Sequence, residues 1–489
     1  MEELLKIIYF DYYNIKKTNN FHTDKEFFRF LYNLKNYKDK KINSKEILKK
    51  YVDPVVKEIR DNIGKSTLND DYFIEKNFVH LTYPFEQTMK RLQIIYISLG
   101  EKEWNEIFSF KYRFFIDFIC FIIRRVLLFN DYALEKDKKR KKEYKESFAE
   151  STNFYFTKAE FYDFFPKYKQ EIDKIFNIIT INIFDLKKET DVFKIIESDN
   201  KYILYFLWDF IYFLYDSIEN EVIKYYSNNC KGIDKYYSRR GKALEKYCYI
   251  NLINAFPKTN IRKNLCYGSK NGNNEIDIIL ETENEFIIFE QKSSKFDIHQ
   301  TKDDKNLKEA FIKAFGNSFK TLNNFYEFAK NGNDIMYFKH NKKKVKLDLK
   351  LKKIILIQVS LHNIEYMQSS IQKFDKNLIK PVTNYPICWN FIDFLTILEL
   401  VKMNTETVME YINKRYDILN RNKKITLDID EIDAMGFLTD SRYEKQYEML
   451  TNNKNNNVDL RFMIRNGAYR NEINELMNSR FYDILFNIE

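Results

Sequence analysis

Two carboxylates and a lysine stand close together near the middle of the chain, at the ends of two short apolar runs. Glu290 and Lys292 close the run EFIIFEQK, and Asp277 lies near the start of the preceding run, IDIIL. Residues two apart in an extended strand project from the same face, so the side chains of Glu290 and Lys292 lie on the same face of the strand. The segment between the runs, ETEN, is turn-like, which predicts an antiparallel hairpin with Asp277 beside Glu290.

This combination of side chains suits the hydrolysis of a phosphodiester. Paired carboxylates hold Mg²⁺, which takes oxygen ligands from one or two acids, water and the substrate phosphate. The metal polarises the phosphate and lowers the pKa of a bound water. Lys292 would orient that water and offset charge on the phosphorus, and the backbone carbonyl of Gln291 would be a further oxygen ligand. The sequence therefore predicts a site for Mg²⁺, or for Mn²⁺, at one edge of a small sheet.

The segment before the hairpin predicts a helix that packs against it. SRRGKALEKYCYINLINAF, at Ser238–Phe256, carries the single apolar stripe of an amphipathic helix, and Pro257 ends that helix. A loop that contains Gly268 and Gly272 then leads to the hairpin. We therefore expect a helix and a sheet edge to meet near Asp277.

A second helix and a buried strand are expected after the hairpin. The helical pattern covers roughly Lys305–Ala329 and is followed by a Lys-rich linker over Lys339–Lys353. The run IILIQVSL, at Ile354–Leu361, has the continuous apolar character of a central strand that is covered on both faces. Helix, hairpin, helix and strand together predict a small α/β unit.

The order of these features resembles the PD-(D/E)XK nuclease superfamily. The family pattern is an acid on a helix, an acid that opens one strand, and Glu/Asp-x-Lys that closes the next. Glu245 in RRGKALEKYCYINL, Asp277, and Glu290-Gln291-Lys292 match it. The resemblance implies a restriction-endonuclease-like core in which Asp277 and Glu290 bind the metal. It also implies that Lys292 assists the attacking water and that Glu245 supports the metal site.

The resemblance covers roughly residues 240–360 and rests on order rather than on any one motif. Glu-x-Lys alone is common in a chain so rich in lysine, and Glu143-Tyr144-Lys145 has the same form. Ile276 also stands where the pattern often has proline. The alternative is that Asp277, Glu290 and Lys292 are the solvent-facing ends of an ordinary hairpin.

A chain of 489 residues is too long for one core and predicts two or three domains. With only 10 Gly and 6 Pro, it favours long helices over folds dense in β-turns. We expect a large α-helical accessory or regulatory region over residues 1–234. An α/β nuclease domain would follow over 235–365, and a helical or α+β domain over 366–489. The expected fold class is therefore mixed.

Composition bounds the partners and the compartment. The net charge of +10 suits a nucleic acid, although the Lys, Asn, Ile and Tyr usage of an AT-rich genome explains it equally. The five cysteines form no CxxC, which indicates reduced thiols. The apolar stretches Phe114–Phe129 and Tyr202–Tyr215 carry charges and are shorter than the ~20 residues of a membrane span. With acidic residues near the N-terminus in place of a signal peptide, the sequence predicts a cytoplasmic protein with no membrane partner.

We therefore expect a Mg²⁺-dependent endonuclease, acting on DNA rather than RNA, and by analogy with the superfamily a role in prokaryotic anti-phage defence. A homo-oligomer or a regulatory partner protein fits the flanking regions. Two other readings stay open, a nucleic-acid-binding module with an inactive nuclease fold and a helical scaffold or regulatory protein. The basic run Glu135–Glu146 is either a solvated loop or exposed helix end, or a patch that contacts phosphates. The segment Lys235–Arg240, in which aromatic and basic residues mix, either stacks on or clamps a nucleic-acid strand, or belongs to the core or to a plain surface.

Overall fold

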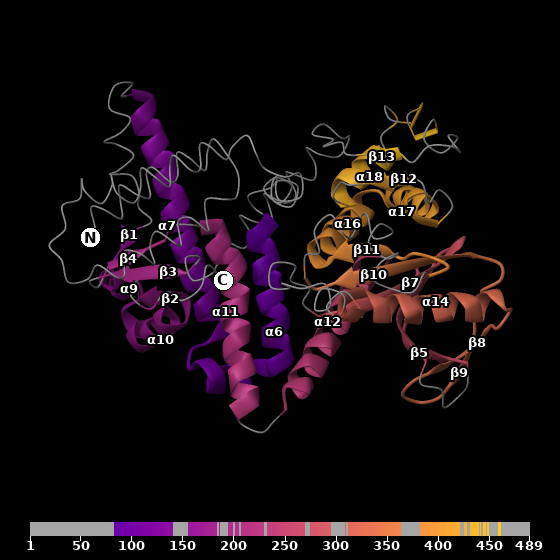
Figure 1. The fold of residues 1–489 in the computed structure, drawn as a ribbon, viewed down its shortest axis with the longest axis horizontal. Helices are drawn as coiled ribbons and strands as arrows, with labels where there is room; N and C mark the ends of the chain where they lie inside the picture. Colours follow the sequence, from indigo (N-terminus) through magenta and orange to yellow (C-terminus); the bar gives the residue numbers. More distant parts are fainter. Residues whose placement is uncertain are drawn as a thin grey trace. The chain divides into compact units, whose positions relative to one another are not determined.

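The protein is described by a computed structural model in which the chain divides into two compact units, with the boundary between Gly232 and Ile233 (Figure 1). The described residues are 83–139, 155–182, 185, 194–198, 201–204, 207–228, 232–268, 274–294, 309, 312–362, 382–420, 425–427, 431–439, 441, 444–445, 447–448 and 458–460. The candidate hairpin lies in the second unit. The three-domain division expected from the sequence stays a prediction.

A seven-stranded sheet forms the centre of the second unit. Its strands are, in spatial order, β11 (Ile387–Asn390), β10 (Lys353–Ser360), β7 (Glu285–Lys292), β6 (Glu275–Glu281), β5 (Asn260–Tyr267), β8 (Ile335–Phe338) and β9 (Lys344–Lys346). The first three run parallel to one another, and the remaining pairs are antiparallel. The predicted hairpin is confirmed as β6 and β7, and the predicted buried strand as β10.

The apolar runs become strands because both of their faces are covered. In β7 and β10, parallel partners such as Ile287 and Ile355, or Ile288 and Leu356, are all fully buried. A strand that is buried on both sides needs apolar residues at successive positions rather than at alternate ones. This explains why EFIIF and IILI show no alternation with polar residues.

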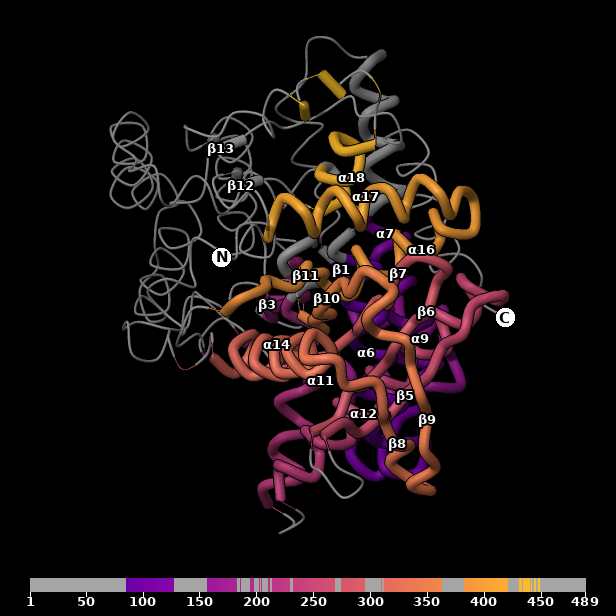
Figure 2. The backbone as a smooth tube through the Cα atoms, turned by 90° about the vertical axis from the view of Figure 1, so that its right-hand side faces the viewer, coloured from indigo at the N-terminus to yellow at the C-terminus, as the bar shows by residue number. Residues whose placement is uncertain are grey.

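Helices pack on opposite faces of β7 and β10. On one face, Phe289 contacts the rings of Trp389 and of Phe394 in α16. On the other face, Gln358, the β10 partner of Glu290, hydrogen-bonds to Ser318 of α14. Figures 1 and 2 show these strands between α14 on one side and α16 with α17 on the other. The helices are α12 (Ile233–Ala255), the π-helical turn η6 (Ile312–Gly316), α14 (Asn317–Lys330), α16 (Phe391–Met403) and α17 (Thr405–Asn420).

The helical pattern of one C-terminal apolar segment extends further than the helix itself. The segment Trp389–Val401 reads as helical throughout, but Trp389 and Asn390 belong to β11 and the helix begins at Phe391. The side chain of Asn390 accepts hydrogen bonds from the backbone N–H groups of Ile392 and Asp393. This cap satisfies two donors that have no partner within the first turn, so the strand changes to helix at that residue.

The segment that follows α17 is held to it by a buried ion pair. Arg415 of α17 donates to Glu431 at 2.7 Å between Nη2 and Oε1, and neither side chain is exposed. Tyr411 also donates to Glu431 through its hydroxyl. The later elements are α18 (Glu431–Thr439) and the parallel pair β12 (Ile425–Leu427) and β13 (Val458–Leu460).

The first unit is mainly helical but also contains a small sheet. Its helices are α6 (Tyr83–Phe108), α7 (Tyr112–Lys139), α9 (Lys158–Phe164), the short turn η3 (Pro166–Tyr168), α10 (Lys169–Ile179) and α11 (Leu207–Asn228). Its sheet, in the order β1-β4-β3-β2, is made of β1 (Tyr155–Phe156), β2 (Thr180–Asn182), β3 (Ile195–Ser198) and β4 (Lys201–Ile203). The prediction of an all-helical region missed these strands because they are only two to four residues long.

The apolar stretches that could suggest membrane spans belong to ordinary elements of this unit. Phe114–Phe129 lies within α7, and Tyr202–Tyr215 is divided between β4 and α11. Within the described residues, no helix is long and apolar enough to cross a bilayer. Cys120, Cys248, Cys266 and Cys388 are buried free thiols, whereas Cys230 lies outside the described residues. The basic run Glu135–Glu146 is described only as far as Lys139, where α7 ends.

Candidate active site at the open end of the hairpin

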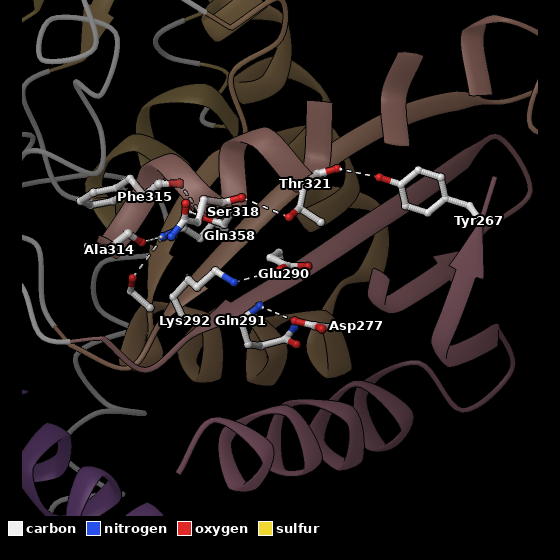
Figure 3. Close-up of polar contacts among 12 residues, drawn as sticks. Tyr267, Asp277, Glu290, Gln291, Lys292, Ala314, Phe315, Ser318, Thr321 and Gln358 are labelled. Atoms are coloured by element: carbon white, nitrogen blue, oxygen red, sulfur yellow. Dashed lines mark hydrogen bonds and ion pairs between the residues drawn. The ribbon is translucent and has the colours of Figure 1, made fainter. Parts of the chain in front are cut away.

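The hairpin opens at the point where the first predicted acid stands. The paired residues of β6 and β7 end at Ile278 and Phe289. Beyond that pair, Oδ2 of Asp277 accepts a hydrogen bond of 3.0 Å from the backbone N–H of Gln291 (Figure 3). A side-chain carboxylate therefore takes the position that a backbone carbonyl holds in a continuous ladder, which fixes Asp277 against β7.

Glu290 and Lys292 lie on one face of β7, as their spacing predicts. Nζ of Lys292 is 2.9 Å from Oε1 of Glu290, and Glu290 is only 5% exposed. The second oxygen of Glu290, Oε2, is buried and has no hydrogen-bond partner among the described residues. A buried carboxylate oxygen without a donor is costly unless the group is protonated or meets a cation.

Glu245 approaches the same edge from α12. A hydrogen bond of 2.6 Å from Nη2 of Arg240 to the backbone carbonyl of Ser293 ties α12 to the end of β7. Glu245 lies just over one turn further along the helix and is half-buried. The negative charge of Asp277 acts on its carboxyl group, although no hydrogen bond joins the two residues. The structure thus links Glu245 to Asp277 and Glu290 through their charges, with no hydrogen bond between it and either acid among the described residues.

Burial and mutual repulsion raise the pKa values of the three acids. Burial is the largest cause at Glu290, followed by the charge of Asp277, and together they raise its pKa to about 8 although Lys292 opposes the shift. Burial, then Asp277 and then Glu275 raise the pKa of Glu245 to about 7. Burial also raises the pKa of Asp277, against the hydrogen bond from Gln291. The three acids therefore keep their protons to a higher pH than free carboxyl groups do.

The positive charge of Lys292 is stabilised by the acids around it. Burial lowers the pKa of this ammonium group, but Glu290 and then Asp277 raise it more, so its net pKa lies above the ordinary value. Lys292 therefore stays protonated wherever at least one neighbouring carboxylate is ionised. A protonated lysine at this position stabilises negative charge and does not act as a base.

The residues present fit a divalent cation that keeps part of its water shell. Within the described residues, no group of three or more His, Cys, Asp or Glu side chains forms a ready-made metal cage. Mg²⁺ is usually held by only one or two carboxylates with water and substrate, so such a cage is not required. The unpartnered oxygen of Glu290 and the neighbouring carboxylate of Asp277 provide this smaller ligand set. The predicted role of the Gln291 carbonyl as a ligand stays a prediction.

The wall of the site opposite β6 was not predicted from the sequence. Gln358 of β10 lies beside Glu290 in register and is fully buried. Its amide donates to the carbonyl of Ala314 at 2.9 Å and accepts from the hydroxyl of Ser318 (Figure 3). Gln358 thus connects the sheet to η6 and α14. The signal that could have revealed it is a single amide in the otherwise apolar run IILIQV.

In comparisons with known proteins, part of this unit is similar to one family model. A family model described as a domain of unknown function (DUF4143) matches residues 240–346, a stretch that contains Glu245, Asp277, Glu290 and Lys292. No curated protein matches the chain, and no solved structure does.

Proposed function

We propose that the chain is a divalent-metal-dependent nuclease that hydrolyses phosphodiester bonds, in DNA rather than RNA. The observation that carries the proposal is the meeting of Asp277, Glu290 and Lys292 at the open end of one hairpin. Each carboxylate is held by its strand, and the lysine stands beside them with its charge retained. The likeness of the motif to PD-(D/E)XK nucleases supports the same conclusion, and a role in anti-phage defence is the wider proposal that this likeness suggests.

Each residue has a distinct part in the proposed reaction. Asp277 and Glu290 would hold Mg²⁺ or Mn²⁺, and a bound ion of this kind would polarise the scissile phosphate and acidify a water. Lys292 orients the attacking water and offsets the charge that develops on the phosphate oxygens. The raised pKa of Glu245 leaves it partly protonated near neutral pH, so it shares a proton with the site rather than adding a full negative charge.

Substitutions that keep the size of the side chains test this proposal. Glu290→Gln and Lys292→Met would be compared with the wild type in cleavage of plasmid DNA, single-stranded DNA and RNA, with Mg²⁺, Mn²⁺ or EDTA. Glu283→Gln is the matched control, because Glu283 is an exposed acid in the turn of the same hairpin. We expect metal-dependent cutting of DNA that both site variants lose and the control keeps. Cutting that survives both substitutions would place the chemistry elsewhere and remove the proposal.

One observation favours a second candidate, a module that binds nucleic acid without cutting it. Lys292 already pairs with one oxygen of Glu290, so the ammonium group occupies a position where a metal ion could otherwise bind. In that case, nucleic acid would bind equally well with Mg²⁺ and with EDTA, and binding would survive Glu290→Gln. The same set of variants therefore separates the two candidates.

A further inference from the structure

One side of α12 carries a row of basic residues that the catalytic proposal does not use. Lys235, Arg239, Lys242 and Lys246 follow one another at spacings of four, three and four. With 3.6 residues in each turn, these positions lie in a narrow strip along one side of the helix. The buried residues of α12 lie on the opposite side, and they are Tyr236, Arg240, Ala243, Leu244, Cys248, Leu252 and Ala255.

The strip is uniformly positive, and its three lysines are open to solvent whereas Arg239 is half-buried. Lys235, Lys242 and Lys246 are exposed, and none of them forms an ion pair within the described part of the chain. The only acids of α12 are Asp234 and Glu245. Both lie about a quarter of a turn away from the strip, on the same side of the helix. An exposed helix face usually alternates charges of both signs, so a strip without acids suits a polyanion.

The strip and the candidate active site share one rigid element. Glu245 faces the charge of Asp277 from the flank of α12, and Arg240 ties the same helix to the end of β7. A ligand that lies along the strip would therefore be held at a fixed position relative to Glu290. The eleven-residue rise from Lys235 to Lys246 spans roughly 16 Å. One strand of duplex DNA carries about five phosphates over that length.

We propose that this strip, Lys235, Arg239, Lys242 and Lys246, binds the phosphate backbone of double-stranded DNA and holds it beside the site. This inference rests on the proposed nuclease function, and it identifies the surface on which the DNA substrate would bind. The row is held straight and rigid by its helix, which suits a stiff duplex better than a flexible single strand. Lysines that contact phosphates provide affinity without reading sequence, so the strip binds duplexes of any sequence.

The test is the salt dependence of binding by a variant that lacks three of these charges. Lys235→Gln, Lys242→Gln and Lys246→Gln would be combined, and binding to a labelled 30-base-pair duplex measured by anisotropy in EDTA at several salt concentrations. The matched control combines Lys320→Gln, Lys330→Gln and Lys350→Gln, which removes equal charge from exposed positions outside the strip. We expect the slope of log K against log salt to shrink by about 2 to 3 in the strip variant alone, because each lost phosphate contact removes about 0.9. Its affinity at 0.1 M salt should fall at least tenfold.

The possible results separate this inference from the proposed function. The strip variant and the control may bind alike while Glu290→Gln still abolishes cleavage. In that case the proposal that the strip binds DNA is wrong, and the proposed nuclease function is retained. If the wild type neither binds the duplex at low salt nor cuts it, both fail together. A third result would be that the same lysines bind vesicles of anionic phosphatidylserine and do not bind the duplex. That result would also contradict the proposal and would indicate a lipid-binding surface instead. Circular dichroism of each variant checks that the helix is retained.

Discussion

The buried carboxyl of Glu290 makes the stability of the second unit depend on pH in a way that a single substitution should remove. Burial and the charge of Asp277 raise the pKa of Glu290 from 4.5 to about 8. Between these two values the folded protein keeps a proton that the unfolded chain has released. Unfolding therefore becomes easier as pH rises through this range, and the effect is complete above pH 8.

The size of the effect follows from the shift. A pKa raised by about 3.5 units corresponds to roughly 5 kcal/mol, at about 1.36 kcal/mol per unit. Coupling with Asp277 and Lys292 divides this free energy among the groups, so we expect the free energy of unfolding to fall by about 2–3 kcal/mol between pH 5 and pH 8. Gln at position 290 keeps the shape and cannot ionise. The Glu290→Gln variant should therefore match the wild type near pH 5 and exceed it in stability at pH 8.

Urea unfolding between pH 5 and pH 9 measures this difference, with hydrogen exchange of peptides from β7 and β10 reporting on the second unit alone. Glu283→Gln, in the exposed turn, should follow the wild type at every pH. Mg²⁺ at 100 times its dissociation constant should restore about 2.7 kcal/mol to the wild type at pH 8 and nothing to Glu290→Gln. Parallel stability curves for wild type and Glu290→Gln would refute the argument that this carboxyl is held neutral by burial.

Three further outcomes are expected. Because the pKa values of Glu245 and Glu290 are raised to about 7 and about 8, Mg²⁺ must displace protons at lower pH. Its affinity, measured by calorimetry in two buffers, should therefore rise from pH 6 to pH 9, and a flat profile would contradict the assignment of these acids. Gln358→Leu leaves the carbonyl of Ala314 and the hydroxyl of Ser318 without their hydrogen-bond partner. It should therefore lower the free energy of unfolding, measured in urea, by about 1–3 kcal/mol. An unchanged free energy would show that these hydrogen bonds to η6 and α14 contribute nothing to stability. Glu431→Gln should cost about 3–5 kcal/mol by the same measurement because Arg415 keeps a buried charge, and pairing it with Arg415→Met should recover most of the loss.

The hairpin that carries the candidate site could be predicted because its information is local. Asp277, Glu290 and Lys292 lie in two adjacent strands joined by a short turn, so their spacing alone determines that they meet. The continuous apolar character of β10 likewise indicates an interior strand without knowledge of its neighbours. In both cases the order of apolar and polar residues along the chain predicts which positions are buried.

Other parts of the fold depend on partners that are distant in the sequence. NIRKNLCY, the segment of β5, mixes basic and polar residues with apolar ones, and it becomes a strand by pairing with β6 and β8. The edge strand β9 is the lysine-rich KVK, which reads as a linker. Gln358 acquires its role only when β10 lies beside β7 and brings the amide to Ser318. Tertiary context decides these cases, and local propensity does not.

The parallel pairing of β7 with β10 also has a consequence for the order in which the molecule assembles. The β6–β7 hairpin needs only its own turn, whereas β10 arrives after α14 and the β8–β9 hairpin have been synthesised. Contacts between segments far apart in the chain close large loops and form slowly, while hairpins form in microseconds. We therefore expect the hairpin to gain protection from hydrogen exchange before β10 does during refolding, with simultaneous protection as the contrary result. Until β10 docks, Glu290 lacks one of the walls that bury it. A chain that is still being synthesised would therefore carry these acids without the enclosed site that the proposed nuclease activity requires.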